Sequence, residues 1–168
     1  LERMSLNGQM QVEGESVVVE VPQGSSRSLT SPGFYPYTTS RDCTLQQGLS
    51  DAGIHPRMFH KSMAVLRTFP IRVGNIIEGQ RQLGFSGHVY NDQHETSWDE
   101  LGLEVERTTV TKRVRRVFTF SMKQYENMLR HSMPGYVMLN FCNYMTSHKA
   151  TQLVERMMQQ EKAMGLSP

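Results

Sequence analysis

Segments typical of short strands alternate along this chain with segments that begin at helix-capping residues. Strands are expected where β-branched or apolar side chains gather, at residues 15–21, 61–68, 108–121 and 136–140. Helices are expected at residues 44–52, 121–131 and 147–164, with a shorter helical start at 96–100. This order of elements favours an α/β fold or a mixed sheet over a helix bundle.

Two long connections interrupt the pattern. Residues 22–44 are rich in Gly, Ser, Pro, Thr and Tyr, and an irregular segment of this length inside a compact domain is usually functional or disordered. The aromatic Tyr35-Pro36-Tyr37 sequence favours an ordered loop. Residues 72–93 carry several glycines without a steady period, which predicts a long loop or an irregular hairpin.

The charge of the chain is nearly balanced, so a charged partner could be attracted only locally. Eighteen Lys and Arg against 16 Asp and Glu leave a net charge of +2, which predicts neither a nucleic-acid partner nor a membrane surface. The longest apolar runs, at residues 17–19 and 136–139, fall far short of the ~20 residues of a membrane span. The local exception is a basic cluster at residues 112–116.

Cysteines and histidines show no metal-ligand spacing. Cys43 and Cys142 lie far apart in the sequence, and the six histidines are scattered without a paired-Cys or HExxH context. We therefore expect no metal site in this chain and interpret the cysteines as two unpaired thiols in a reducing compartment.

The basic cluster lies in the predicted strand at residues 108–121. Alternation along a strand would place Thr111, Arg113 and Arg115 on one face and Arg116 on the other. Two guanidinium groups about 6.5–7 Å apart could bind both ends of a dicarboxylate, or a carboxylate and a phosphate. The alternative is a solvated edge strand whose arginines discourage pairing with other chains.

A second candidate is the turn Gln23-Gly24-Ser25-Ser26 after the first predicted strand. Such turns resemble the backbone-amide cradles that bind phosphates beyond strand ends. An ordinary surface loop is the alternative. The chain contains no GxxxxGK[ST] sequence, so this turn is not a standard P-loop.

Four segments, in this order along the chain, resemble motifs of one enzyme family. They are Val-Glu-Val-Pro-Gln-Gly at 19–24, Phe-Tyr-Pro-Tyr-Thr-Thr-Ser at 34–40, Ile-Arg-Val-Gly at 71–74 and Thr-Val-Thr-Lys-Arg-Val-Arg-Arg at 109–116. They resemble the Glu-Gly-Ala-Gln-Gly turn, the Thr-Tyr-Pro-Tyr-Val-Thr-Ser segment, the Thr-Arg-Val-Gly turn and the Ala-Thr-Thr-Gly-Arg-Pro-Arg-Arg loop of adenylosuccinate synthetases. The resemblance covers residues 17–144, and its details resemble the phage-type 2-amino-2′-deoxyadenylosuccinate synthetases.

The resemblance implies a mostly parallel sheet with flanking helices, related to the P-loop NTPases. It also implies that residues 1–168 form the C-terminal part of a single synthetase domain. The family's N-terminal phosphate loop, with its catalytic aspartate, its Mg²⁺ ligand and the catalytic histidine after it, has no counterpart in this sequence. Any Mg²⁺ ligands are therefore expected in that part.

The activity implied by the resemblance is the joining of L-aspartate to C6 of a purine nucleoside monophosphate. The substrate would be dGMP in the phage-type branch and IMP in the ordinary family. ATP or dATP would phosphorylate the purine O6, and the amine of aspartate would displace it. A homodimer in the cytoplasm, or the host cytoplasm for a phage protein, is implied. The alternative is a non-catalytic remnant that binds nucleotides or partners.

The resemblance also assigns residues to ligands. It implies that Gln23, Gly24 and Thr39 contact the substrate nucleotide, with Val73 and Gly74 near its ribose.

It further implies that Thr111, Arg113 and Arg115 bind aspartate, and that Arg113 is also catalytic. Lys112 replaces the family's usual glycine. Residues 140–143 read Asn-Phe-Cys-Asn where GTP-using members have Thr-Lys-Leu-Asp. Asn140 and Asn143 would therefore lie at the base of the donor nucleotide, without the carboxylate that accepts the guanine donors.

Overall fold

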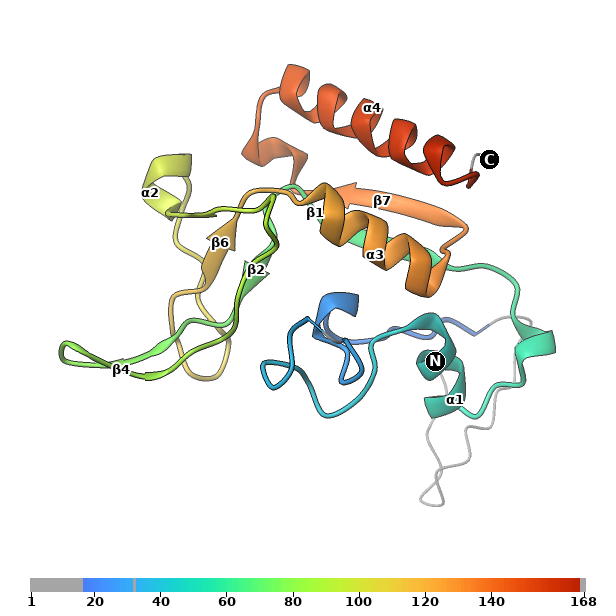
Figure 1. The fold of residues 1–168 in the computed structure, drawn as a ribbon, viewed down its shortest axis with the longest axis horizontal. Coiled ribbons are helices and arrows are strands. Elements are labelled where there is room, and N and C mark those ends of the chain that lie inside the picture. The colour runs from blue at the N-terminus through green and yellow to red at the C-terminus, as the bar shows by residue number, and fades with distance from the viewer. Residues whose placement is uncertain (1–16, 32, 167–168) are drawn as a thin grey trace.

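The computed structural model describes residues 17–31 and 33–166 of the chain. Its helices are α1 (Leu45–Asp51), α2 (Trp98–Leu101), α3 (Met122–Ser132) and α4 (Ser147–Ala163), with 3-10 turns η1 (Ser25–Arg27), η2 (Pro56–Met58) and η3 (Cys142–Tyr144). Its strands are β1 (Met63–Arg67), β2 (Ile71–Arg72), β3 (Ile76–Glu78), β4 (Arg81–Gly84), β5 (Glu95–Thr96), β6 (Arg116–Phe118) and β7 (Tyr136–Asn140). The fold is a mixed α/β arrangement (Figure 1).

The main core lies between the β1–β7 pair and the two longest helices. β1 and β7 pair in parallel, from Met63 opposite Tyr136 to Arg67 opposite Asn140. Helices α3 and α4 lie over this pair in Figure 1. The buried core side chains come from these helices: Tyr125, Met128, Leu129, Leu153 and Met157. The strand residues that pack against them are Ala64, Leu66, Val137 and Leu139.

The expectation of a mostly parallel sheet is wrong for the residues that the structure describes. β2, β6 and β5 form an antiparallel sheet, and β3 and β4 form an antiparallel hairpin that extends away from the helices in Figure 1. A tight turn at Gly79 joins β3 to β4, and a connection this short can join only antiparallel strands. Residues 72–93 therefore do contain the irregular hairpin that their composition predicts.

The strand predicted at residues 15–21 is also wrong where the structure describes it. Residues 17–21 form no strand, and residues 15 and 16 lie outside the described part. Val18 is 91% exposed. An added Cβ on Gly48 of α1 would overlap the side chain of Val21, so this segment packs against a helix instead of a partner strand.

The predicted strand at residues 108–121 is a turn followed by a short strand. Only Arg116–Phe118 forms a strand, while Arg107 and Val114 make an isolated bridge. Between them the Thr108 carbonyl accepts a hydrogen bond from the Lys112 N–H at 3.1 Å, and the Thr108 hydroxyl accepts one from the Arg113 N–H at 3.0 Å. Threonine hydroxyls that bond to nearby backbone favour such turns over a sheet.

The remaining predicted elements are confirmed within a few residues. The hydroxyls of Thr44 and Ser121 accept hydrogen bonds from the backbone at the starts of α1 and α3. Ser97 and Glu100 form a capping box at α2. None of the helices in the described part of the chain is both long and apolar enough to cross a membrane.

Candidate functional site

An open hollow of about 730 Å³ lies between the turn after β2, the start of α2 and the loop that leads into β6. Gly74 and Asn75 form one side, and Arg113 and Arg115 form another. Three of the predicted site residues, Gly74, Arg113 and Arg115, therefore lie around one space. Hollows of this volume hold small-molecule ligands in proteins.

Gly74 allows the two sides of this hollow to meet. An added Cβ on Gly74 would overlap the backbone carbonyl oxygen of Val114 and would lie 3.5 Å from the Cβ of Arg113. The backbone of the β2 turn and that of the arginine loop therefore touch directly. A side chain at this position would push the arginines away from the turn.

The backbone of the arginine loop is held on both sides of Arg115. The Arg115 N–H donates to the Glu106 carbonyl at 2.8 Å, and the Arg115 carbonyl accepts from Trp98 Nε1, also at 2.8 Å. Trp98 is only 4% exposed. A buried indole therefore fixes the position from which the Arg115 side chain leaves the loop.

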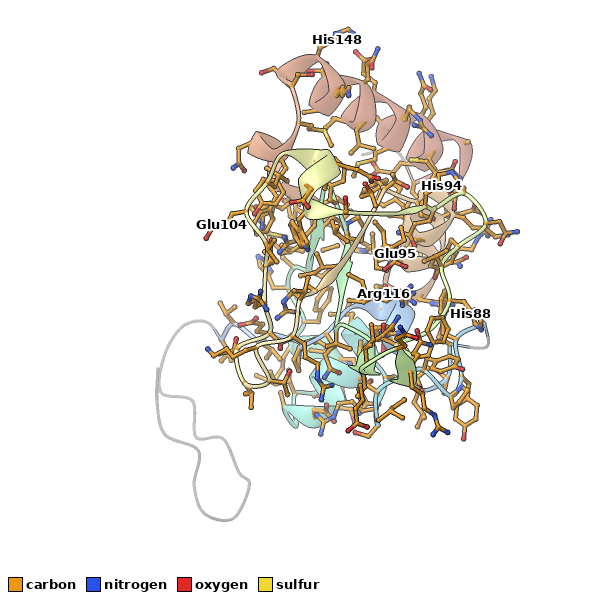
Figure 2. All side chains as sticks on the ribbon, turned by 90° about the vertical axis from the view of Figure 1, so that its left-hand side faces the viewer. His88, His94, Glu95, Glu104, Arg116 and His148 are labelled. Atoms are coloured by element: carbon orange, nitrogen blue, oxygen red, sulfur yellow. The ribbon has the colours of Figure 1, made fainter. Side chains whose placement is uncertain are left out.

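The side chains of Arg113 and Arg115 are free to bind a ligand. Within residues 17–31 and 33–166, neither guanidinium has a hydrogen-bond or ion-pair partner. Arg116 differs, because its guanidinium binds Glu95, the Ser86 hydroxyl and the Gly87 carbonyl. Glu95 and Arg116 lie together in Figure 2. Arg116 is a structural residue, whereas Arg113 and Arg115 line the hollow together with the carboxylate residues Glu95 and Asp99.

Thr111 does not join the two arginines in the hollow. Its hydroxyl pairs with the Thr108 hydroxyl at 2.7 Å and so closes the turn. Strand alternation, which predicted that the three side chains share a face, is wrong here because these residues form a turn. The two arginines still line the same hollow.

Gln23 and Thr39 lie on either side of Cys43. The Cys43 sulfur is 3.9 Å from Gln23 Oε1 and 3.6 Å from the Thr39 hydroxyl. Gln23 has a positive φ of 70°, and Gly24 precedes the η1 turn. Two of the three residues predicted to contact the nucleotide, Gln23 and Thr39, therefore lie close together around Cys43, although they are 16 positions apart in the sequence.

Arg27 connects this loop to the β-rich part of the molecule. Its guanidinium donates to the Tyr37 carbonyl at 2.6 Å and to the Ser86 carbonyl at 2.8 Å. Ser86 also binds Arg116, which begins β6. The nucleotide-loop candidates and the arginine loop are thus joined through one hydrogen-bonded network. Val73, which precedes Gly74, is half exposed beside it.

Asn140 and Asn143 are not among the residues that line the hollow. Asn140 ends β7, where its carbonyl accepts a hydrogen bond from the backbone N–H of Thr68, and Asn143 is exposed within η3. The Thr68 hydroxyl donates to the Phe141 carbonyl at 2.7 Å and fixes the left-handed turn at Phe141. Two hydrogen bonds from Thr68 therefore hold the end of this strand, and Asn143 follows it in the chain.

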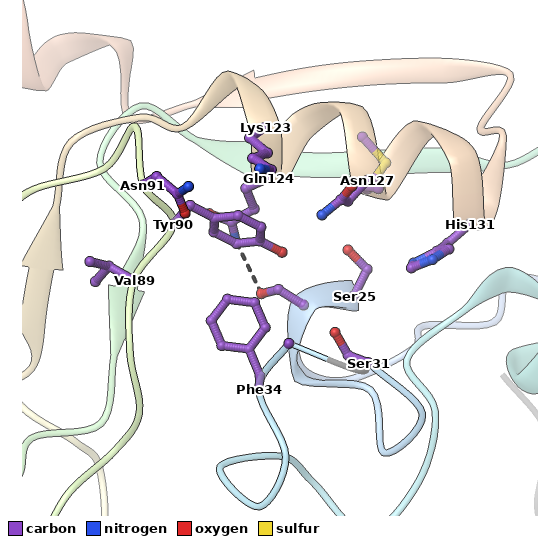
Figure 3. Close-up of a pocket in the computed structure, with 13 residues that line it drawn as sticks. Ser25, Ser31, Phe34, Val89, Tyr90, Asn91, Lys123, Gln124, Asn127 and His131 are labelled. Atoms are coloured by element: carbon purple, nitrogen blue, oxygen red, sulfur yellow. Dashed lines mark hydrogen bonds between the residues drawn. The ribbon is translucent and has the colours of Figure 1, made fainter.

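A second, smaller pocket of about 310 Å³ lies between α3 and the loop that begins at Ser25 (Figure 3). Lys123, Asn127 and His131, spaced four residues apart on α3, face Ser25 and Ser31 across it. Gln124 Nε2 donates to the Ser26 hydroxyl at 3.0 Å, and the buried Phe34 and Tyr90 rings pack 4.9 Å apart. Burial raises the pKa of the Tyr90 hydroxyl.

Sequence patterns missed this pocket. The only signal was the spacing of Lys123, Asn127 and His131, which any exposed helix face can show. The described residues that line the pocket include no carboxylate. In the described part of the chain there is also no group of three or more His, Cys, Asp or Glu side chains that could hold a metal ion.

Comparison with known proteins agrees with the arrangement of these motifs. The adenylosuccinate synthetase family matches residues 3–161. The N6-succino-2-amino-2′-deoxyadenylate synthase of Acinetobacter phage SH-Ab 15497 is 43% identical over 80% of this chain and 35% of its own length. That of Vibrio phage phiVC8 is 46% identical over 79% of this chain and 36% of its own length.

A solved structure is also similar. It is the Cyanophage S-2L succinoaminodeoxyadenylate synthetase bound to dGMP and dATP as an energy donor, with a TM-score of 0.72 and 37% identity over 82% of this chain and 39% of that one. The chain spans less than half the length of each of these relatives. Because the family match extends over nearly all of its residues, the chain belongs to the adenylosuccinate synthetase family.

Proposed function

We propose that this chain supplies the aspartate- and purine-binding part of a ligase that joins L-aspartate to C6 of a purine nucleoside monophosphate. The observation that carries the proposal is the pair Arg113 and Arg115, which line one hollow with Gly74 and have no partner within the described residues. Two guanidinium groups match the two carboxylates of aspartate.

The proposed substrate is dGMP, and the proposed energy donor is ATP or dATP. The solved relative from Cyanophage S-2L is bound to dGMP and to dATP as an energy donor. The resemblance implies that Asn143 stands where GTP-using family members have an aspartate. Gln23, Gly24 and Thr39 would bind the nucleotide, and Val73 and Gly74 would lie beside its ribose. Asn140 and Asn143 would lie at the donor base.

The chemistry is an exchange at C6 of the purine. Transfer of a phosphoryl group to O6 makes that oxygen a leaving group, and the amine of aspartate then displaces it as phosphate. Arg113 would stabilise the negative charge near C6, and Arg115 would hold the aspartate side chain. Mg²⁺ and the phosphate loop, which neutralise the donor phosphates, would come from the part of the domain that residues 1–168 do not span.

A chimera tests this proposal. In the chimera, this chain replaces its matching segment in the Vibrio phage phiVC8 enzyme. We expect it to form the succino product from dGMP, L-aspartate and ATP, whereas the chain alone forms none. Turnover by the chain alone would contradict the division of roles. A folded chimera that binds both substrates without turnover would favour a non-catalytic remnant.

A further inference from the structure

One short segment, Ser86-Gly87-His88, binds three arginines that come from distant parts of the chain. Its three successive carbonyls each accept a hydrogen bond from a different guanidinium: Ser86 from Arg27 at 2.8 Å, Gly87 from Arg116 at 2.9 Å and His88 from Arg72. His88 and Arg116 mark this place in Figure 2. We call residues 86–88 the 86–88 segment.

Each of these arginines adjoins a different part of the candidate site. Arg27 follows the turn at residues 23–24 along the same loop. Arg72 directly precedes the turn at residues 73–74, and Arg116 directly follows Arg115. The 86–88 segment therefore binds next to the residues proposed for the nucleotide, for its ribose and for aspartate.

Arg27 connects a proposed nucleotide contact to this segment. Its carbonyl accepts hydrogen bonds from the Thr39 N–H at 2.8 Å and from the Thr39 hydroxyl at 3.0 Å. Its guanidinium donates to the Tyr37 carbonyl at 2.6 Å as well as to Ser86. A displacement of Thr39 on nucleotide binding would therefore reach Ser86 through one residue.

Ser86 connects in turn to the arginine loop by two routes. Its hydroxyl accepts a hydrogen bond from Arg116 Nη1 at 2.9 Å, and its N–H donates to Asn75 Oδ1 at 3.0 Å. Asn75 follows Gly74, whose backbone lies against the Val114 carbonyl. Ser86 is only 8% exposed, so these bonds are shielded from water.

The 86–88 segment cannot shift independently of the nucleotide loop. Gly87 has a φ of 106°, and an added Cβ would lie 2.7 Å from the Cβ of Tyr37 and 3.2 Å from a guanidinium nitrogen of Arg72. The backbone at Gly87 therefore packs directly on Tyr37, and a side chain at this position would force the two apart.

The three arginines also repel one another. Burial, together with the charges of Arg27 and Arg116, lowers the pKa of the Arg72 guanidinium to about 10. The carbonyls of the 86–88 segment and the carboxylate of Glu95 offset this repulsion. The relative positions of the three arginines therefore depend on this segment.

We propose that the 86–88 segment couples the binding of the substrate nucleotide to the binding of aspartate, with Arg27 as the positioning residue on the nucleotide side. The proposal rests on the proposed function, because it uses the sites assigned there. Coupling between two sites typically changes affinity about five- to 150-fold, and each ligand must strengthen the other by the same factor.

Equilibrium binding to the Vibrio phage chimera tests the proposal without turnover. Calorimetry measures the Kd for L-aspartate with and without saturating dGMP, in the absence of ATP. Arg27→Met removes the guanidinium, whereas Arg27→Lys keeps a charged donor for one of the two carbonyls. Arg41→Met is the matched control, because this arginine lies on the same loop and its side chain pairs with Asp51 on α1.

We expect dGMP to lower the Kd for aspartate at least about fivefold in the chimera and in Arg41→Met. In Arg27→Met this effect should fall below about twofold, while the Kd without dGMP changes less than about twofold. Arg27→Lys should restore part of the coupling. Equal coupling in Arg27→Met and the unsubstituted chimera would overturn the proposal, and so would an equal loss of aspartate affinity with and without dGMP.

Ser86→Ala tests the same connection from the aspartate side, also where Arg27→Met does not fold. It removes one hydroxyl that binds Arg116, and we expect it to lower the coupling at least about twofold. Unchanged coupling in Ser86→Ala would overturn the proposal.

The same measurements separate this proposal from the proposed function. A chimera that binds both substrates without coupling would overturn the role of the 86–88 segment alone. Coupled binding without turnover after ATP is added would reject the ligase function and leave the coupling standing. A folded chimera that binds neither substrate would overturn both.

Discussion

Arg116 binds the carboxylate of Glu95 through two parallel hydrogen bonds, from Nε to Oε1 at 2.7 Å and from Nη2 to Oε2 at 2.6 Å. The arginine begins β6 and the glutamate begins β5, so the pair joins neighbouring strands. The Arg116 side chain is only 10% exposed and also binds Ser86 and Gly87. This pair anchors the loop that carries the candidate aspartate-binding arginines.

Replacing Arg116 should therefore destabilise the fold. We expect Arg116→Leu to lower the free energy of unfolding by about 1–3 kcal/mol, because it leaves partly buried acceptors unpaired. Arg130→Leu, which removes an exposed pair with Glu126 on α3, is the control and should cost about 0.5 kcal/mol or less. Urea unfolding measures both, and equal losses would show that Arg116 has no special structural role.

Lys112 has a φ of 55°, in the left-handed region that favours glycine. We expect Lys112→Gly to raise the free energy of unfolding by about 0.5–1 kcal/mol. The backbone strain that glycine removes from the folded state exceeds the stability lost because glycine increases the conformational entropy of the unfolded chain. Val110, which is 89% exposed in the same turn and has no positive φ, provides the control. Thermal unfolding that shows an equal gain for Val110→Gly would contradict this explanation.

The sequence predicts the elements whose determinants are local. Thr44 and Ser121 cap their helices as expected, and β1 and β7 lie within the predicted ranges. The strand prediction fails at residues 108–115 because the Thr108 hydroxyl and the left-handed backbone of Lys112 close a turn. Strand propensity takes no account of such local hydrogen bonds. The antiparallel pairing of β6 could not be predicted from the sequence either, because its partner strands are distant along the chain.

The candidate site was predicted in part. Arg113 and Arg115 do line one hollow, as predicted. A turn and the hydrogen bond from Trp98 Nε1 to the Arg115 carbonyl produce this arrangement, whereas strand alternation does not. The adjacency of Gln23 and Thr39 around Cys43 follows from how the long loop folds back on itself. The pocket beside α3 could not be found from the sequence, because residues from three distant segments form it.

The free energy of unfolding should fall in acid, in part because the carboxylate of Asp92 becomes protonated. Burial alone would raise the pKa of this carboxyl, but hydrogen bonds from Ser121 and from the backbone at the start of α3 hold that pKa below its ordinary value. The carboxylate therefore stabilises the fold above the unfolded-state pKa of about 3.9, and this contribution is lost as pH falls through the lower folded value.

Asp92→Asn should weaken the pH dependence of the free energy of unfolding in acid. Urea unfolding of both proteins from about pH 6 to pH 2 checks this, since the difference between them should shrink as the pH falls. A difference that stays constant over this range would mean that the charge of Asp92 does not contribute.

Asn143 should set the choice of donor nucleotide in the active chimera. An amide lacks the charge with which a carboxylate accepts two guanine donors, so we expect kcat/KM for ATP or dATP to equal or exceed that for GTP. Asn143→Asp should move this ratio toward GTP by about tenfold. A strict GTP requirement before substitution would show that residues 140–143 do not lie at the donor base.

The affinity for aspartate tests the central proposal most directly. Each charge-assisted contact contributes about 1.5–3 kcal/mol, so Arg115→Leu in the chimera should raise the KM for aspartate roughly ten- to a hundredfold. The KM for dGMP should change less than about twofold, and Arg57→Leu on the exposed η2 turn should change neither. An unchanged KM for aspartate, or equal losses for aspartate and dGMP, would contradict the assignment of Arg115 to aspartate.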